Sequence, residues 1–198
     1  MKKILLILFA SIGVQQLAAQ DEDYAITMSY PVGFPVGSMH NFIQQTSFLG
    51  LSAEFTKRTG TNVDIVFEVG WHTFYSRSDE KTFTDGTVSI SGVQDRYTNV
   101  APVLLGFKYT VPTETKIKPY FAFGMGAMYS ERRREISRYP IETDTWQFLM
   151  RPEVGIIYKT DFDISPLIGV KYYGSFGNQD LSGQSFLSIS VGLRISII

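Results

Sequence analysis

An alternation of apolar and polar residues with a period of two recurs along most of the chain. The clearest case is 187–197, where leucine, isoleucine and valine at odd positions alternate with serine, glycine and arginine at even positions. A β-strand has this period because successive side chains point to opposite faces of the sheet. Seven further stretches follow the same rule: 24–30, 49–56, 63–72, 103–109, 121–129, 147–158 and 164–172. The sequence therefore predicts eight strands, each with one apolar and one polar face.

The connections between these strands alternate in length. The short connections are 57–61, 110–116 and 159–162, and the long ones are 31–45, 76–95, 130–145 and 174–184. This alternation is typical of a transmembrane barrel with tight periplasmic turns, longer extracellular loops and both chain ends in the periplasm. We therefore expect an all-β fold, an eight-stranded antiparallel up-and-down barrel that forms one domain over residues 20–198.

The N-terminal residues have the pattern of a secretory signal peptide. Lys2 and Lys3 precede an apolar stretch over residues 4–14, and Leu17-Ala18-Ala19-Gln20 is a plausible cleavage site. We expect residues 1–19 to be removed on export. An uncleaved membrane anchor is the alternative, but the apolar run is shorter than the roughly 20 residues that a spanning helix needs. A mature chain that spans a membrane must then do so as a closed barrel.

Alternation alone does not say whether the apolar face meets lipid or the cavity of a soluble, lipocalin-like barrel or sandwich. Aromatic residues gather at both ends of the apolar faces, as in the interfacial girdles of membrane barrels. The polar faces carry four acids and four bases, and buried charges need such partners. We expect these residues to form a charge network that fills a narrow lumen: Glu54, Asp64, Glu68, Glu153, Lys108, Arg151, Lys171 and Arg194.

Composition excludes several classes of function. The net charge of -1 gives no basic field, so we expect no nucleic-acid partner. With Cys 0 there is no disulfide, thiolate metal site, cysteine nucleophile or lipidated cysteine. His40 has no metal-ligand spacing around it, and we expect neither a metal nor a cofactor.

Several short stretches resemble the small bacterial outer-membrane β-barrel domain proteins of the OmpA and OmpX type. They are Ser29-Tyr30-Pro31-Val32-Gly33, Glu68-Val69-Gly70-Trp71, Lys118-Pro119-Tyr120 with Gly124 and Gly126, Arg151-Pro152-Glu153-Val154-Gly155, and Val191-Gly192-Leu193. The resemblance covers nearly the whole mature chain, and none of these stretches is a catalytic motif. It implies a location in the outer membrane and a role in adhesion, envelope integrity or small-solute passage. It also implies outer-membrane lipid and, during biogenesis, the barrel-assembly machinery as partners. Such barrels usually end on an aromatic residue, whereas this chain ends at Ile197-Ile198.

Three features remain as candidates for function. Glu68 and His72 share the polar face of one strand and could suggest a lipid A deacylase or phospholipase. Four residues of strand separate them by about 13 Å, too far for a direct hydrogen bond. A second feature is the basic run Arg132, Arg133, Arg134 and Arg138, which could clamp lipopolysaccharide phosphates or be a solvated loop base.

The third feature is the first long connection, whose apolar residues could meet a partner or pack over the barrel mouth: Phe34, Met39, Phe42 and Ile43. Taken together, the sequence predicts a non-enzymatic membrane anchor with a plugged lumen and long external loops. The alternatives are, in order, a porin or transporter for small or apolar solutes and a lipid A or phospholipid hydrolase.

Overall fold

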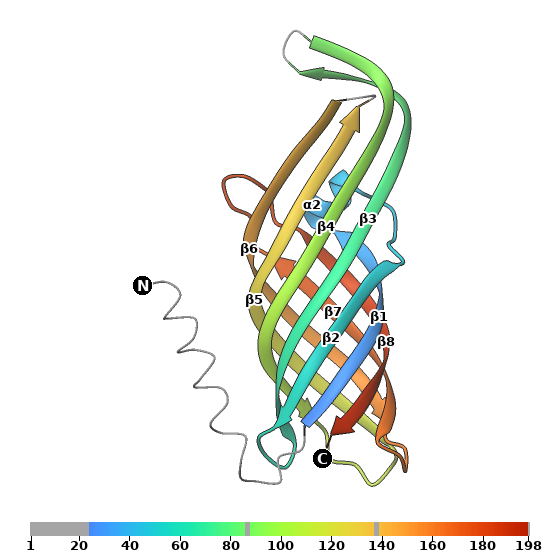
Figure 1. Cartoon of the computed structure of the whole chain (residues 1–198), viewed down its shortest axis with the longest axis vertical. Helices are drawn as coiled ribbons and strands as arrows, with labels where there is room; N and C mark the ends of the chain where they lie inside the picture. Colours follow the sequence, from blue (N-terminus) through green and yellow to red (C-terminus); the bar gives the residue numbers. More distant parts are fainter. Residues whose placement is uncertain (1–23, 86–87, 137–138, 198) are drawn as a thin grey trace.

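The structure, a computed structural model, describes residues 24–85, 88–136 and 139–197, so the predicted signal peptide lies outside it. Within these residues, eight antiparallel strands form a closed barrel in chain order, in which β1 pairs with β8 (Figure 1). The strands are β1 (Tyr24–Val36), β2 (Leu49–Arg58), β3 (Val63–Asp85), β4 (Val88–Thr110), β5 (Ile117–Ile136), β6 (Tyr139–Tyr158), β7 (Ile164–Ser175) and β8 (Ser185–Ile197). The predicted all-β, eight-stranded barrel is confirmed.

The apolar face of every strand points away from the lumen. On β8, Val191 is 59% exposed and Leu193 51%, whereas Ser188 and Ser190 are fully buried. The other strands repeat this pattern, and the outer surface is a continuous belt of large apolar side chains. Such a belt is stable only where the surrounding medium is itself apolar. The structure therefore fits a barrel in lipid, and a soluble lipocalin-like barrel, which keeps its apolar face inside, does not fit it.

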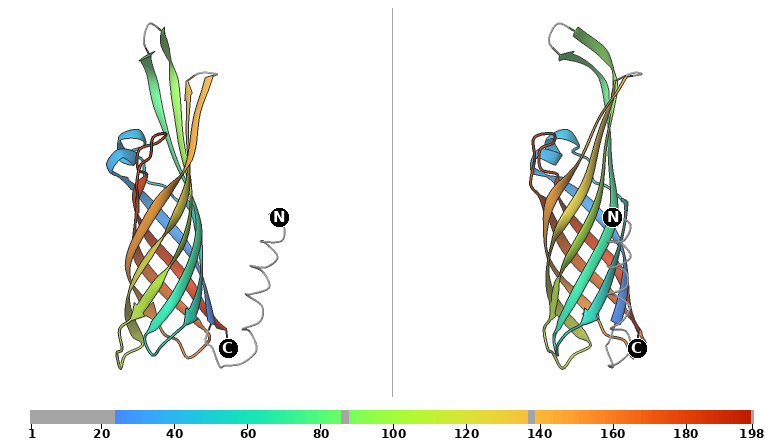
Figure 2. Two further views of the ribbon diagram at one scale, coloured as in Figure 1. Left: turned by 90° about the vertical axis from the view of Figure 1, so that its left-hand side faces the viewer. Right: turned by 60° about the vertical axis from the view of Figure 1, so that its left-hand side comes forward.

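The two ends of the barrel differ. At one end, which we call the terminus end, Tyr24 pairs with Ile197 and the three short turns lie close together (Figure 1). At the opposite end, strands β3 to β6 rise beyond the barrel as two long hairpins (Figure 2). We call these hairpins the ribbons and this end the ribbon end. Pairing between β4 and β5 continues as far as Gln94 and Ile136, well past the last β6–β7 pair, Leu149 with Ser175.

These hairpins correct two of the predicted connections. We expected long loops over 76–95 and 130–145, but the described residues of both stretches extend the strands: β3 and β4 have 23 residues each, and β5 and β6 have 20 each. A strand needs only about 9–11 residues to cross a bilayer. Beyond the lipid both faces of a strand meet water, so the apolar and polar alternation that marks a membrane strand is no longer required. That is why periodicity did not reveal these extensions.

The first long connection folds back over the barrel mouth. Strand β1 continues to Val36, and Gly37, with a φ of 59°, turns the chain into the short helix α2 (Gly37–Phe42). A positive φ of this kind is easily adopted only by glycine. Met39, Phe42 and Ile43 are buried, so of the two alternatives for these apolar residues the structure supports packing over the mouth. Within the described residues, no helix is long and apolar enough to cross a membrane.

Close contact between β4 and β5 depends on glycine. Gly106 lies opposite Gly124 in the ladder, and a Cβ atom on Gly106 would lie 2.1 Å from the carbonyl oxygen of Phe123. A Cβ atom on Gly126 would lie equally close to the carbonyl oxygen of Val103. A larger residue at either position would push the two strands apart.

Candidate functional site

The lumen is filled by three successive layers of side chains. A polar vestibule opens at the terminus end, a cluster of buried charges lies next to it, and an aromatic layer under helix α2 closes the ribbon end. The residues of the charge cluster and the rings of the aromatic layer come from the polar-face positions of the strands, which the pleat directs inward. The vestibule is lined in part by turn residues such as Thr61 and Pro112.

The charge cluster joins strands from opposite sides of the barrel. Glu54 on β2 accepts hydrogen bonds from the amines of Lys108 on β4 and Lys171 on β7, each at 2.6 Å. The same Lys171 amine lies 3.3 Å from the Glu68 carboxylate. All four side chains are at least 98% buried. These contacts bridge the lumen from wall to wall.

Arg151 on β6 completes the cluster. Its Nε atom lies 3.0 Å from Oε2 of Glu68, and its Nη1 atom forms an ion pair with Glu153. Two tyrosine hydroxyls donate to the remaining carboxylate oxygens: Tyr120 to Glu153 at 2.6 Å and Tyr173 to Glu68 at 2.5 Å. Each carboxylate therefore has a cationic partner, and two have a hydroxyl donor as well. Charges removed from water are tolerated only under such conditions.

The three carboxylates of this cluster converge on one point. Oxygen atoms of Glu54, Glu68 and Glu153 all lie within 4.8 Å of one another. Carboxylates so close would repel strongly in a medium of low dielectric constant. Three cations of the protein, Lys108, Lys171 and Arg151, supply the compensating charge, so the cluster is neutral as three acids and three bases. That no metal binds here stays a prediction.

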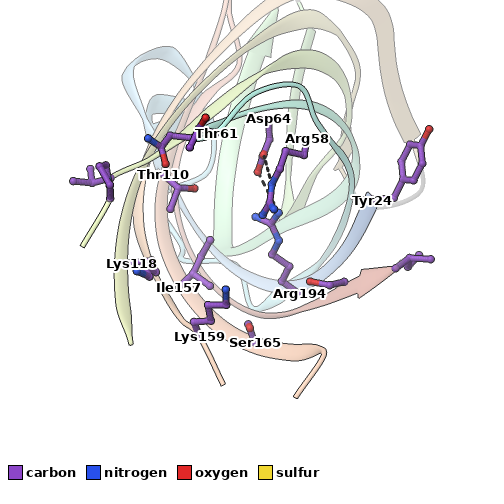
Figure 3. A pocket seen from close by; sticks show the side chains of 15 residues that line it. Tyr24, Arg58, Thr61, Asp64, Thr110, Lys118, Ile157, Lys159, Ser165 and Arg194 are labelled. Carbon is purple, nitrogen blue, oxygen red and sulfur yellow. Dashed lines mark hydrogen bonds and ion pairs between the residues drawn. The ribbon is translucent and has the colours of Figure 1, made fainter. Parts of the chain in front are cut away.

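The vestibule at the terminus end is a cavity of about 420 Å³ (Figure 3). Asp64 lies on its wall, accepts a hydrogen bond from Arg194 at 3.1 Å and is 4.0 Å from Nε of Arg58. Lys118 and Lys159 add two more positive charges to the lining. None of the six cluster residues lines it. The eight charges expected to form one network are thus divided: six meet in the cluster, and Asp64 and Arg194 form a separate pair.

The aromatic layer closes the lumen toward the ribbon end. The rings of Tyr173 and Phe186 stack with their centroids 4.5 Å apart, and Phe74 meets Phe186 edge-on at 5.2 Å. His72 packs against Phe186 at 4.8 Å. All four side chains are at most 1% exposed. Met39 and Ile43, from helix α2 and the residue after it, cover this layer.

The candidate hydrolytic pair is not arranged for catalysis. The Glu68 carboxylate is occupied by Arg151, Lys171 and Tyr173. His72 is 1% exposed and surrounded by rings, and its Nε2 atom is buried without a hydrogen-bond partner. A general base must reach both an orienting acid and a substrate. Neither condition is met here. This agrees with the sequence-based expectation that Glu68 and His72 are too far apart for a direct hydrogen bond.

The structure separates the arginines of the basic run. Side chains at even positions of β5 point inward, and Arg132 and Arg134 lie against Phe42 of helix α2. Arg133 points outward and forms ion pairs with Glu135 and Glu142. Arg138 lies outside the described residues. The run therefore does not form one surface, as a single clamp on lipid phosphates would require.

Sequence reasoning missed the residues that close the lumen. Tyr120 and Tyr173, which support the charges, and Phe74 and Phe186, which form the aromatic layer, were not among the candidates. One signal was present: each is a large aromatic residue at a position where the alternation calls for a polar side chain. Aromatic residues at lumen positions of a narrow barrel indicate a filled interior.

No protein-family model matches the sequence, and no curated protein is significantly similar to it. Solved structures with the same fold do exist. Neisserial surface protein A aligns with a TM-score of 0.58 and 12% identity over 89% of this chain and 99% of that chain. A major outer membrane protein from Thermus thermophilus aligns with a TM-score of 0.60 and 11% identity over 90% and 100%.

The outer membrane protease OmpT of Escherichia coli aligns with a TM-score of 0.53 and 7% identity, over 89% of this chain and 97% of that chain. At such identities the likeness concerns the fold alone, and it does not transfer the activity of any of these proteins. It confirms, at the level of fold, the resemblance seen in the sequence. The protein therefore has the fold of the small outer-membrane β-barrels, with strands that are long enough and apolar enough on their outer face to be transmembrane.

Proposed function

We propose that the protein is a non-enzymatic anchor in the outer membrane, with a closed lumen and with ribbons that make contacts outside the cell. One observation carries the proposal: a neutral cluster of six charged side chains, each at most 3% exposed, bridges the lumen beneath a layer of packed rings. A barrel of eight strands is just wide enough for side chains to fill it. The likeness to small outer-membrane barrels supports the location.

The contacts explain why the lumen should not conduct. A permeating ion would have to separate pairs such as Lys171 and Glu54, which are 2.6 Å apart. Breaking a buried pair leaves an uncompensated charge and costs about 3–5 kcal/mol. Beyond the charges, the ion would meet the rings of Tyr173 and Phe186, which offer no hydration. The charge cluster and the aromatic layer are thus two successive barriers to an ion, and they support a closed lumen rather than a selective channel.

A transporter is the second candidate, because the vestibule of about 420 Å³ could admit a small solute from the terminus end. It does not continue through the charge cluster, so passage would need a rearrangement of the plug. A lipid hydrolase comes third. OmpT shows that a similar barrel can belong to a protease, but the arrangement of Glu68 and His72 does not support catalysis in this chain.

Planar-bilayer recording of the purified full chain tests the proposal. We expect no stable single-channel conductance from the wild type. Tyr173→Ala combined with Phe186→Ala removes part of the aromatic layer but leaves all six charges, and we expect this variant to remain closed as well. Heat-modifiable migration on a gel establishes that both proteins are folded barrels. Reproducible channels from the folded wild type would overturn the closed-lumen proposal in favour of the transporter.

The orientation is a further part of the proposal. We place the terminus end in the periplasm, after removal of residues 1–19, and the ribbons outside the cell. The outward Arg133 would then lie near lipopolysaccharide head groups. Its ion pairs with Glu135 and Glu142 would compete with binding to a lipid phosphate. Protease treatment of intact cells should cleave the ribbons between β3 and β6 and leave the barrel protected. Protection of the ribbons in intact cells, with cleavage only after lysis, would reverse the orientation.

A further inference from the structure

The root of the ribbon has opposite charges on its two faces. Five acidic residues of β4, β5 and β6 occupy outward positions of the alternation: Asp95, Glu131, Glu135, Glu142 and Asp144. Arg96 on β4 and Arg132 and Arg134 on β5 occupy inward positions, above the barrel mouth. The ladder between β4 and β5 runs without a register shift through this region, so the two faces remain distinct. The inner face is therefore basic and the outer face acidic.

A single ring holds the three inward arginines together. The guanidinium carbons of Arg96, Arg132 and Arg134 lie 5.4, 4.2 and 5.4 Å from the centroid of Phe42. Guanidinium groups pack favourably on an aromatic face, which restricts their positions before any ligand arrives. The ring itself is only 7% exposed and belongs to helix α2, which the barrel mouth supports.

The hydrogen bonds that anchor Arg96 and Arg132 use neutral acceptors. Arg96 donates to the carbonyl of Phe42 at 3.0 Å and to the side chain of Gln94 at 3.2 Å. Arg132 donates to the side chain of Gln184 at 2.9 Å. The Nε atoms of Arg96 and Arg132 are buried and have no hydrogen-bond partner. Burial lowers the pKa of Arg132, and the nearby Arg134 lowers it further. The acceptors of Arg96 and Arg132 in these hydrogen bonds are thus a carbonyl and two side-chain amides, and none of them is a carboxylate.

We infer that Arg96, Arg132 and Arg134, arranged around Phe42, form a binding site for a phosphate group presented from the ribbon side of the barrel. The guanidinium fork matches the oxygens of a phosphate, and several forks can share one such group. All three side chains are only partly buried, so a ligand can reach them. The phosphate could belong to a soluble molecule or to a lipid head group. This site does not depend on whether the lumen conducts.

Calorimetric titration of the full chain in phosphatidylcholine vesicles, with pyrophosphate as the probe, tests this inference. We expect saturable binding that weakens with added salt. Substituting Arg96, Arg132 and Arg134 together by Gln should lower the affinity at least about tenfold. Arg133→Gln, on the outer face of the same strand, is the matched control and should leave the affinity nearly unchanged. Arg132→Lys, which keeps the charge but not the fork, should fall between the wild type and Arg132→Gln.

Two results would overturn the site: absence of saturable binding by the folded wild type, or equal losses in Arg133→Gln and the triple variant. The single Arg132 variants guard against a triple variant that fails to fold, and heat-modifiability on a gel identifies that failure. Vesicles that contain phosphatidic acid distinguish the source of the phosphate. If the site takes a lipid phosphomonoester, this lipid should compete with pyrophosphate in the wild type; if it takes a soluble phosphate, the affinity should not change.

Discussion

Removing one buried charge tests whether the charged side chains of the lumen form a buried, neutral cluster, as they do in the structure. In Arg151→Met, Glu153 keeps only the hydroxyl of Tyr120 among its hydrogen-bonding partners in the described residues, whereas Glu68 keeps Lys171 at 3.3 Å. The cluster then carries one uncompensated negative charge in a site that is at most 3% exposed. We expect the free energy of unfolding to fall by about 3–5 kcal/mol.

A second substitution separates the charge effect from the packing effect. Arg151→Met with Glu153→Gln restores neutrality and retains a side chain that can bond to Tyr120. If burial of an unpaired charge is the main cost, the double variant should be more stable than the sum of the two single variants by about 1–3 kcal/mol. A loss of volume alone would give additive effects, because methionine fills much of the space of arginine in every background.

Reversible urea unfolding in lipid vesicles measures these energies. Trp71 and Trp146, 48% and 59% exposed on the outer surface, report the loss of the lipid environment by fluorescence. The reasoning would be refuted if Arg151→Met cost less than about 1 kcal/mol, the value of an exposed pair. Additive single and double variants would equally refute it, since the charges would then not be coupled.

The remaining predictions concern the outer face of the barrel, the contact between β4 and β5, and helix α2, which covers the barrel mouth as a lid. Val191→Arg places a charge on the lipid face and should cost about 2–4 kcal/mol near the bilayer centre in the same unfolding assay; a neutral effect would mean that no lipid surrounds β8. Gly106→Ala forces β4 away from β5 and should lower the free energy of unfolding by about 1–3 kcal/mol, whereas alanine at the open, exposed Gly60 should be tolerated. Phe42→Ala should loosen helix α2 without unfolding the barrel, seen as faster protease cleavage near residues 37–43 while heat-modifiability persists; unchanged cleavage would show that the ring does not hold the lid.

The barrel itself could be predicted from the sequence because lipid imposes a simple rule. Every membrane strand must be apolar outside, so residues such as Val191 and Leu193 alternate with Ser190 and Arg194. The inward direction of the charged side chains follows from the same period of two. Their need for partners follows from burial. The strand number, the two faces and the presence of a charged lumen are therefore properties of the local pattern.

The tertiary structure decided which charges meet. Glu54 pairs with Lys171, 117 positions away in the chain, whereas Asp64 pairs with Arg194 in a separate layer. Stagger between strands and height along the barrel axis determine these distances, and neither can be read from the alternation. The division of the eight charges into six and two is accordingly a result of the closed barrel.

Only the structure, too, revealed the ribbons and the lid. Outside the lipid, both faces of a strand meet water, so neither face has to be apolar. The extensions of β3 to β6 therefore show no clear alternation of apolar and polar residues in the sequence. Arg132, Arg133 and Arg134 are neighbours in the chain, yet the pleat sends Arg133 to one face and the other two toward Phe42. The sequence determined what must face lipid because burial in lipid acts on each residue alone, whereas contacts between side chains depend on where the whole fold brings them.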